Sequence, residues 1–152
     1  MDLDADDRRI LALIQEEGIL NPHRIRTRLG LSQAQSHRRL RRLEASGAIE
    51  RYTAVLCPEA LGLRFEARAF AVLAADDELS VRAFERAVFS IPHIVQAERL
   101  GGDIDYLLHV RTTSRSTCEQ LVEDTLHALP GLAELTWAPV ASRLRSEVTL
   151  PI

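Results

Sequence analysis

Residues 31–47 read LSQAQSHRRLRRLEASG, and this stretch carries the signals of a short, well-bounded helix. Ser32 is a residue type that caps the free amides of a helix, and Gln35 lies where its side chain can complete a capping box. Ser36, Leu40 and Leu43 recur at helical spacing and form one inward stripe. A glycine such as Gly47 commonly follows the end of a helix. The stretch therefore predicts a helix over residues 32–46 with one buried face.

Two further helices are predicted ahead of this one. Apolar residues recur at helical spacing within residues 10–14, behind an acidic first turn, and Gly18 follows them. Asn21-Pro22 supplies an N-cap and a proline at the first helical position, which opens a helix that stops at Gly30. Three short helices with a glycine in the last turn form a helix-turn-helix, in which residues 32–46 take the recognition position.

The outward face of the predicted recognition helix is polar and basic. In this motif the N-terminal end of the recognition helix enters the major groove, and residues further along meet phosphates. A solvated amphipathic helix would also explain the arginines, but not the capped helices before it. The candidate DNA-binding residues are Ser32, Gln33, Ala34, Gln35, His37, Arg38, Arg41 and Arg42, the last two facing phosphates.

The distribution of charge supports a nucleic-acid partner, although the total does not. The chain has 152 residues, a mass of 17.0 kDa and a formal net charge of -3. Residues 20–55 nevertheless carry eight arginines against two acidic residues, a net +6, so the rest of the chain carries -9. All 19 basic residues are arginine, whose planar guanidinium suits bidentate phosphate and base contacts. A compact basic block between acidic segments indicates nucleic-acid binding.

Composition excludes several other classes of protein. With 46% hydrophobic and 27% charged residues, the chain is typical of a globular protein. Cys57 and Cys118 lie far apart and show no ligand spacing, so no disulfide framework, metal site or other cofactor is expected. The acidic N-terminus is unlike a signal peptide, and the protein is expected in the cytoplasm.

The second half of the chain predicts an α+β domain. Residues 48–56 are β-prone and residues 57–62 are turn-like, which indicates a connecting strand and a hinge. Strand, helix, strand, strand, helix and strand then follow over residues 64–73, 79–91, 94–100, 106–110, 116–129 and 133–141. This order is the ferredoxin-like βαββαβ arrangement, with both helices on one face of the sheet. We expect the other face to be apolar and to be covered by a second copy of the chain.

The sequence resembles the Lrp/AsnC, or feast/famine, family of transcription regulators over nearly its whole length. The matching segments, in order, are Leu3-Asp4 with Asp7, Ile10 and Leu11; Leu29-Gly30-Leu31-Ser32; residues 38–44; Gly47-Ala48-Ile49; Tyr52-Thr53-Ala54; residues 102–108, Gly102-Asp103-Ile104-Asp105-Tyr106 with Leu107-Leu108; and Leu129-Pro130-Gly131-Leu132. The resemblance implies a helix-turn-helix DNA-binding domain over residues 1–50, a linker strand over residues 51–63 and a ligand-sensing and oligomerisation domain over residues 64–152. It also implies a homodimer, assembly of dimers into octamers and an amino-acid effector bound between dimers.

The sensing loop of that family matches a glycine-rich turn in this sequence. The resemblance assigns effector binding to Gly101, Gly102, Asp103, Asp105 and Tyr106. Glycines let backbone amides approach a carboxylate, and an acidic side chain pairs with an ammonium, so such a loop suits an amino acid. The alternative is an ordinary hairpin turn in which Asp103 caps its own backbone.

Two other functions remain open from sequence alone. Siroheme decarboxylases are similar to this family in fold, but they depart from the sensing-loop motif kept here. The five histidines are scattered without a paired acid and base, so the sequence favours a protein that is not an enzyme. A nucleoid-organising protein that binds DNA with little response to a ligand would share every feature described above.

Overall fold

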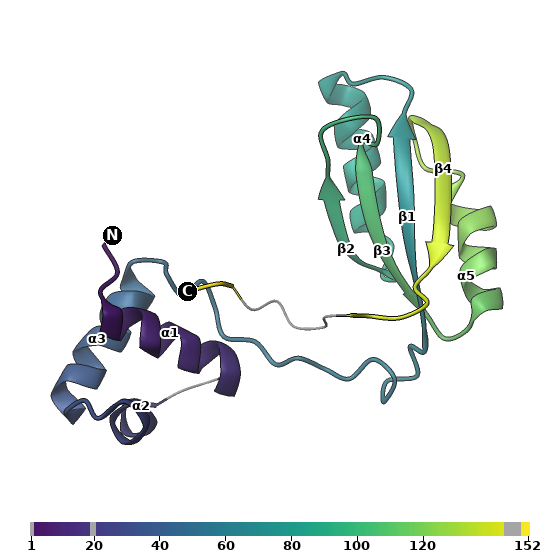
Figure 1. The fold of residues 1–152 in the computed structure, drawn as a ribbon. Coiled ribbons are helices and arrows are strands. Elements are labelled where there is room, and N and C mark those ends of the chain that lie inside the picture. The colour runs from purple at the N-terminus through teal and green to yellow at the C-terminus, as the bar shows by residue number, and fades with distance from the viewer. Residues whose placement is uncertain (1, 19–20, 145–149) are drawn as a thin grey trace. The chain divides into compact units, whose positions relative to one another are not determined.

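The computed structural model describes residues 2–18, 21–144 and 150–152, and the chain divides into two compact units at Val55 and Leu56. The first unit holds three helices, α1 (Ala5–Glu17), α2 (Pro22–Leu29) and α3 (Gln33–Ala45) (Figure 1). The final residues belong to this unit: the side-chain amide of Gln15 exchanges two hydrogen bonds with the backbone of Leu150, at 2.7 and 3.3 Å.

The predicted caps of α2 and α3 are present. The Asn21 side chain accepts from the amide of Arg24 at 3.0 Å, and Gly30 ends α2. Ser32 and Gln35 form the reciprocal capping box that opens α3. Ser36 is fully buried, and its hydroxyl donates to the carbonyl of Ser32 at 2.9 Å. The one polar side chain on the inward face of Ser36, Leu40 and Leu43 therefore has a hydrogen-bond partner. These local bonds confirm the helix boundaries expected from the sequence.

Six buried side chains hold the three helices together. They come from all three helices, so α3 is positioned by packing against both α1 and α2: Ile10, Leu11, Leu13, Ile25, Leu40 and Leu43. Burial of an aliphatic side chain of this size contributes about 1.5–3 kcal/mol. The exposed side of α3 is therefore presented by a fixed scaffold.

Gly47 follows α3 with a φ of +76°, the left-handed conformation expected after a helix. No atom lies within 4 Å of where a Cβ would be, so substitution meets no clash and costs only backbone strain. We expect Gly47→Ala to destabilise α3 by about 1 kcal/mol, measured by hydrogen exchange of its amides. Gly101→Ala is the control, because Gly101 has open space and no positive φ. An equal effect of both variants would contradict the strain argument.

The predicted strand over residues 48–56 is wrong. Residues 50–57 form neither helix nor strand, and a turn follows at residues 58–62. A strand is stable only when a neighbour satisfies its backbone groups, and this segment has no strand partner within the described residues. Val55 is 94% exposed and Leu56 is 66% exposed, so β-prone side chains alone did not produce a strand.

The second unit is an antiparallel sheet with helices on one face (Figure 1). Its strands are β1 (Phe65–Leu73), β2 (Ile94–Arg99), β3 (Tyr106–Thr112) and β4 (Leu132–Pro139), in the spatial order β2-β3-β1-β4. The helices are α4 (Glu78–Phe89), α5 (Arg115–Leu121) and a π-helical continuation, η1 (Val122–Leu126). This is the predicted ferredoxin-like α+β fold. The helix expected over residues 116–129 is not α-helical throughout, because its last turns, η1, widen to the π form.

The core of the second unit lies between the sheet and its helices. Alternate residues of β1 and β3 point to this side, including Ala67, Ala69, Leu108 and Val110, and they pack on Phe84 of α4. The small alanines of β1 leave room for the larger side chains of the helices. The core therefore fixes the position of α4 against the sheet.

The opposite face of the sheet is not the uniformly apolar surface expected from the sequence. Phe70 and Leu107 lie there beside a charged network, in which Glu66 pairs with Arg68 at 2.6 Å and with Arg111 at 2.8 Å. His109 lies on the same face, 3.4 Å from Glu98. Burial, assisted by the charge of Arg68, lowers the pKa of His109. The apolar prediction failed because it took no account of the charged residues that alternate with the alanines of β1.

Candidate nucleic-acid interface and sensing region

The exposed face of α3 gathers the residues predicted to contact DNA. Ser32, Gln33, Ala34, Gln35, His37, Arg38, Arg41 and Arg42 are all exposed. Two of them already use their polar groups within the helix: the Ser32 hydroxyl accepts from the amide of Gln35, and Gln35 Oε1 accepts from the amide of Ser32 at 2.9 Å. These two side chains therefore shape the N-terminus of α3, while the others project without that constraint.

Part of the basic block is neutralised by the acidic start of α1. Asp7 is fully buried and binds Arg39, with Oδ1 2.9 Å from Nη1, and also binds Arg42. Asp4 accepts from the same nitrogen of Arg39 at 2.6 Å, and this bond lowers the pKa of Asp4 to about 2. Arg42, predicted for phosphate contact, thus has an ion pair inside the protein. The sequence did not reveal this cluster, because its members lie about 35 residues apart.

Glu17 neutralises a second pair of arginines. Its carboxylate lies 3.0 Å from Arg24 and 2.6 Å from Arg28, and the glutamate side chain is only 14% exposed. The positive charge of residues 20–55 is therefore partly neutralised within the unit. On α3, Arg38 and Arg41 are exposed and have no ion pair among the residues that the structure describes. On α3 itself, these two side chains carry the positive charge that has no ion pair among the described residues.

The predicted sensing loop is not one continuous surface. Gly101, Gly102 and Asp103 are exposed, and Gly102 has a φ of +131°, which favours glycine. Tyr106 points the other way, into the core beside α4, where its hydroxyl donates to Glu85 Oε1 at 2.8 Å. Burial and this carboxylate raise the pKa of Tyr106 to about 12. The structure thus separates Tyr106 from the exposed tip of the loop.

Asp105 attaches the loop to the C-terminal end of β1. Its Oδ2 accepts from the amide of Leu73 at 2.7 Å, where the register of β1 against β4 shifts, and its amide donates to the carbonyl of Ala71 at 3.0 Å. The carbonyl of Asp105 accepts from the amide of Leu100 at 2.7 Å, which closes the turn. One oxygen of this carboxylate therefore has a structural role.

We expect Asp105→Ala to destabilise the second unit by about 2 kcal/mol, because the amide of Leu73 would lose a charged acceptor. Denaturant unfolding, followed by the fluorescence of Trp137, measures this loss of stability, because Trp137 lies on β4 in this unit. Asp103→Ala is the matched control in the same loop, since Asp103 is exposed. An effect of Asp103→Ala as large as that of Asp105→Ala would contradict the anchoring role.

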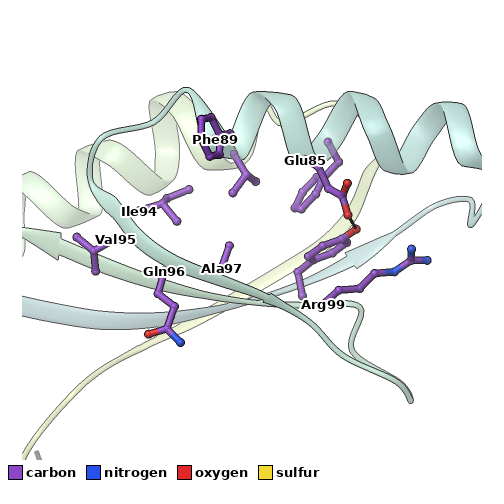
Figure 2. A pocket seen from close by; sticks show the side chains of 10 residues that line it. Glu85, Phe89, Ile94, Val95, Gln96, Ala97 and Arg99 are labelled. Carbon is purple, nitrogen blue, oxygen red and sulfur yellow. Dashed lines mark hydrogen bonds between the residues drawn. The ribbon is translucent and has the colours of Figure 1, made fainter. Parts of the chain in front are cut away.

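A groove between α4 and the edge strand β2 begins beside this loop. Its volume is about 420 Å³, and Figure 2 shows the side chains that line it. Tyr106 is the one predicted effector residue among them. One signal of an unfilled surface was the exposed Phe89 at the end of an amphipathic helix. The other lining residues were not predicted from the sequence, and they are Phe84, Glu85, Val88, Phe89, Ile94, Val95, Gln96, Ala97 and Arg99.

The described part of the chain offers neither a cluster of metal ligands nor a helix that could span a membrane. Among these residues, no group of three or more His, Cys, Asp or Glu side chains is arranged to hold a metal ion. None of the described helices combines the length and the apolar character needed to cross a membrane.

Comparison with known proteins agrees with this architecture. A family described as winged helix-turn-helix DNA-binding matches residues 3–50, and one described as Lrp/AsnC ligand binding domain matches residues 69–150. The leucine-responsive regulatory proteins of Escherichia coli K12 and Salmonella typhimurium are each 34% identical over 131 residues, covering 86% of this chain and 80% of theirs.

Solved structures show the same fold. A transcriptional regulator from Neisseria meningitidis, crystallised as an L-Met complex, superposes with a TM-score of 0.91 at 29% identity, covering 99% of this chain and 97% of the other. An AsnC family transcriptional regulator from Agrobacterium tumefaciens gives a TM-score of 0.87 at 24% identity, covering 97% and 96%.

A helix-turn-helix unit joined to a ligand-binding α+β unit defines the class of ligand-responsive DNA-binding regulators. The chain belongs to the Lrp/AsnC family, and it is a ligand-responsive transcriptional regulator.

Proposed function

We propose that the protein binds specific DNA sites through α3 and that an amino acid controls this binding. The proposal of DNA binding rests on the exposed face of α3, where Arg38 and Arg41 have no ion pair among the described residues. The L-Met complex of the similar Neisseria regulator supports the proposal of control by an amino acid. The three proposed parts are the DNA-binding domain 1–50, the linker 51–63 and the sensing domain 64–152.

Within this proposal the predicted DNA contacts divide by their bonding. Gln33, Ala34, His37 and Arg38 face base edges, because they are exposed near the N-terminal end of α3. Arg41 meets phosphate. Ser32, Gln35 and Arg42 act indirectly, by fixing the helix end and its contact with α1, because their polar groups already have partners.

The proposed assembly is a homodimer that forms octamers, with the loop Gly101–Asp105 and Tyr106 near the effector. The sheet face that carries Phe70 and Leu107 lacks helices, so it is the surface on which a second copy would pack. The family resemblance supports this assembly. In a dimer, two recognition helices would meet half-sites about 34–36 Å apart. The proposed place of action is the cytoplasm.

Thermal-shift screening of the full chain against the twenty amino acids tests the effector half, because a ligand of the folded state raises the apparent melting temperature. Footprinting of the gene's own upstream region tests the DNA half. No shift with any amino acid would overturn amino-acid sensing, and no protection at moderate salt would overturn specific DNA binding.

We also propose that the protein is not an enzyme and that it discriminates among DNA sequences. Incubation with siroheme should leave the mass of the tetrapyrrole unchanged, whereas loss of carboxylate would reveal a decarboxylase.

A selected site should be bound about 10³-fold or more tightly than random DNA at equal salt. Equal affinity would instead indicate a nucleoid-organising protein.

A further inference from the structure

One inner strand places a histidine on the helix-free face of the sheet, which also carries Phe70 and Leu107 and which we call the open face. The histidine is His109 of β3, and its neighbours across the strands are Arg68 of β1 and Gln96 of β2. The residues before and after His109 point into the core. Because side chains alternate along a strand, the His109 ring lies on the open face.

The His109 ring is largely buried although no helix covers it. Its side chain is 19% exposed, and the buried Nε2 makes no hydrogen bond to a described residue. Glu98 Oε2 lies 3.4 Å from this nitrogen, while Glu98 Oε1 accepts from the side chain of Gln96 at 3.0 Å. Burial and the charge of Arg68 favour the neutral ring. They outweigh the attraction of Glu98 and Glu66 for a protonated ring, so the pKa of His109 is lowered.

The other charges of the open face are largely paired with one another. The Glu66 carboxylate bonds to Arg68 at 2.6 Å and to Arg111 at 2.8 Å, and Arg143 bonds to the same carboxylate. Burial opposes the ionisation of Glu66, but hydrogen bonds from Arg143 and Arg68 outweigh it and lower its pKa. With Glu98 these side chains carry three positive and two negative charges, a net +1. A proton on the neighbouring histidine raises this charge to +2.

We propose that His109 makes the pairing of two chains through the open face sensitive to pH, so that acidification separates the dimer. At neutral pH the uncharged ring is covered together with Phe70 and Leu107, and the paired charges around it need no new partner. Both copies of a two-fold dimer bury the same face, so acid places two additional positive charges in one interface. This inference rests on the proposed homodimer and adds a control of its assembly.

The direction of the effect follows from proton linkage. Separated chains bind a proton at His109 more readily than the dimer does, because pairing removes the water that solvates a charged ring. The dimer therefore has its full stability above the pKa of His109 in the separated chain, and it weakens as the pH falls through that value. Two rings titrate, so the dissociation constant rises by up to about a hundredfold per pH unit below this point. Glu66 keeps its charge in this range because its pKa is lowered.

Sedimentation equilibrium of the full chain at one ionic strength tests this inference on both sides of the ordinary histidine pKa, at about pH 8 and about pH 5. We expect the dissociation constant of the dimer to be about tenfold or more higher at the lower pH. A fluorescent label on the exposed Cys57, which leaves the buried Cys118 unmodified, extends the measurement to dilute samples. For a very tight dimer, the rate at which labelled chains exchange between dimers measures the same change. Fluorescence of Trp137 in unlabelled chains confirms that the second unit is folded at both pH values.

Four variants assign the effect to one ring. His109→Gln should form the dimer equally well at both pH values, because its side chain stays neutral. His109→Arg should weaken the dimer at both, since its charge does not titrate. His127→Gln is the matched control, because His127 is exposed at the end of η1 and should leave the pH dependence unchanged. His93→Gln should leave it unchanged too, although Nδ1 of His93 lies 3.0 Å from the carbonyl of Arg111.

The outcomes separate this inference from the proposed assembly. A dimer whose dissociation constant changes by less than about threefold between the two pH values would overturn the inference and leave the homodimer intact. An unchanged pH dependence in His109→Gln, or its loss in His93→Gln or His127→Gln, would assign the effect to other groups and overturn the role of His109. Chains that remain single at both pH values would overturn the homodimer and this inference together.

Discussion

Replacing Arg38 and Arg41 together by alanine is expected to lower the affinity for a selected DNA site about a hundredfold, since each arginine contact to a base or phosphate contributes about 1–3 kcal/mol. Both side chains are exposed on α3, whereas Arg39 and Arg42 are held by Asp7. The affinity should also depend less steeply on salt, with a slope smaller by about 1 for each phosphate that no longer has an arginine partner. Fluorescence anisotropy with a labelled duplex at several salt concentrations measures both effects.

The matched control is the double variant Arg82→Ala with Arg115→Ala. These arginines are also exposed, each pairs with a glutamate on its own helix, and both lie in the second unit. The control removes the same total charge, so a merely global electrostatic effect would weaken binding equally in the two double variants. That equality would contradict the assignment of α3 as the recognition helix.

Replacing Asp7 by alanine is expected to destabilise the first unit by about 3–5 kcal/mol. The carboxylate is fully buried, pairs with Arg39 and Arg42, and also accepts from the amide of Asp4 at 3.2 Å to complete the capping box of α1. Its removal leaves Arg39 with a side chain only 19% exposed and without its most buried partner. Hydrogen exchange of the amides of α1 and α3 measures the loss in this unit alone.

Asp6 provides the control for this second variant. Its side chain is 32% exposed and lies 3.3 Å from Arg39, so Asp6→Ala should cost no more than about 1 kcal/mol. If Asp7→Ala and Asp6→Ala proved equally mild, the buried ion pair would not be what joins α1 to the recognition helix.

Local chemistry explains which parts of the first unit could be predicted from sequence. The caps at Asn21 and Ser32 depend on bonds between residues three apart, so the residue types alone predict the ends of α2 and α3. The pair of Asp7 with Arg39 depends on how α1 packs on α3, which helical periodicity does not specify. The sequence thus predicted a basic face correctly but not which arginines remain unpaired.

The second unit shows the same division. Alternation in residues 64–73 predicted β1, because the period of two is a local property. The segment 48–56 had β-prone residues but no neighbour to pair with, and β-propensity cannot supply one. The groove brings Glu85 of α4 beside Arg99 of β2, and this contact follows only from the way the helix crosses the edge of the sheet.

In the proposed function, one chain couples DNA binding to the binding of an amino acid. The most direct test measures the affinity of the full chain for a duplex selected from random sequences, at fixed salt, with and without the amino acid that gives the largest thermal shift. We expect the effector to change the dissociation constant at least about fivefold, which corresponds to the lower end of a typical coupling free energy. Identical dissociation constants with the effector present at saturation would contradict it.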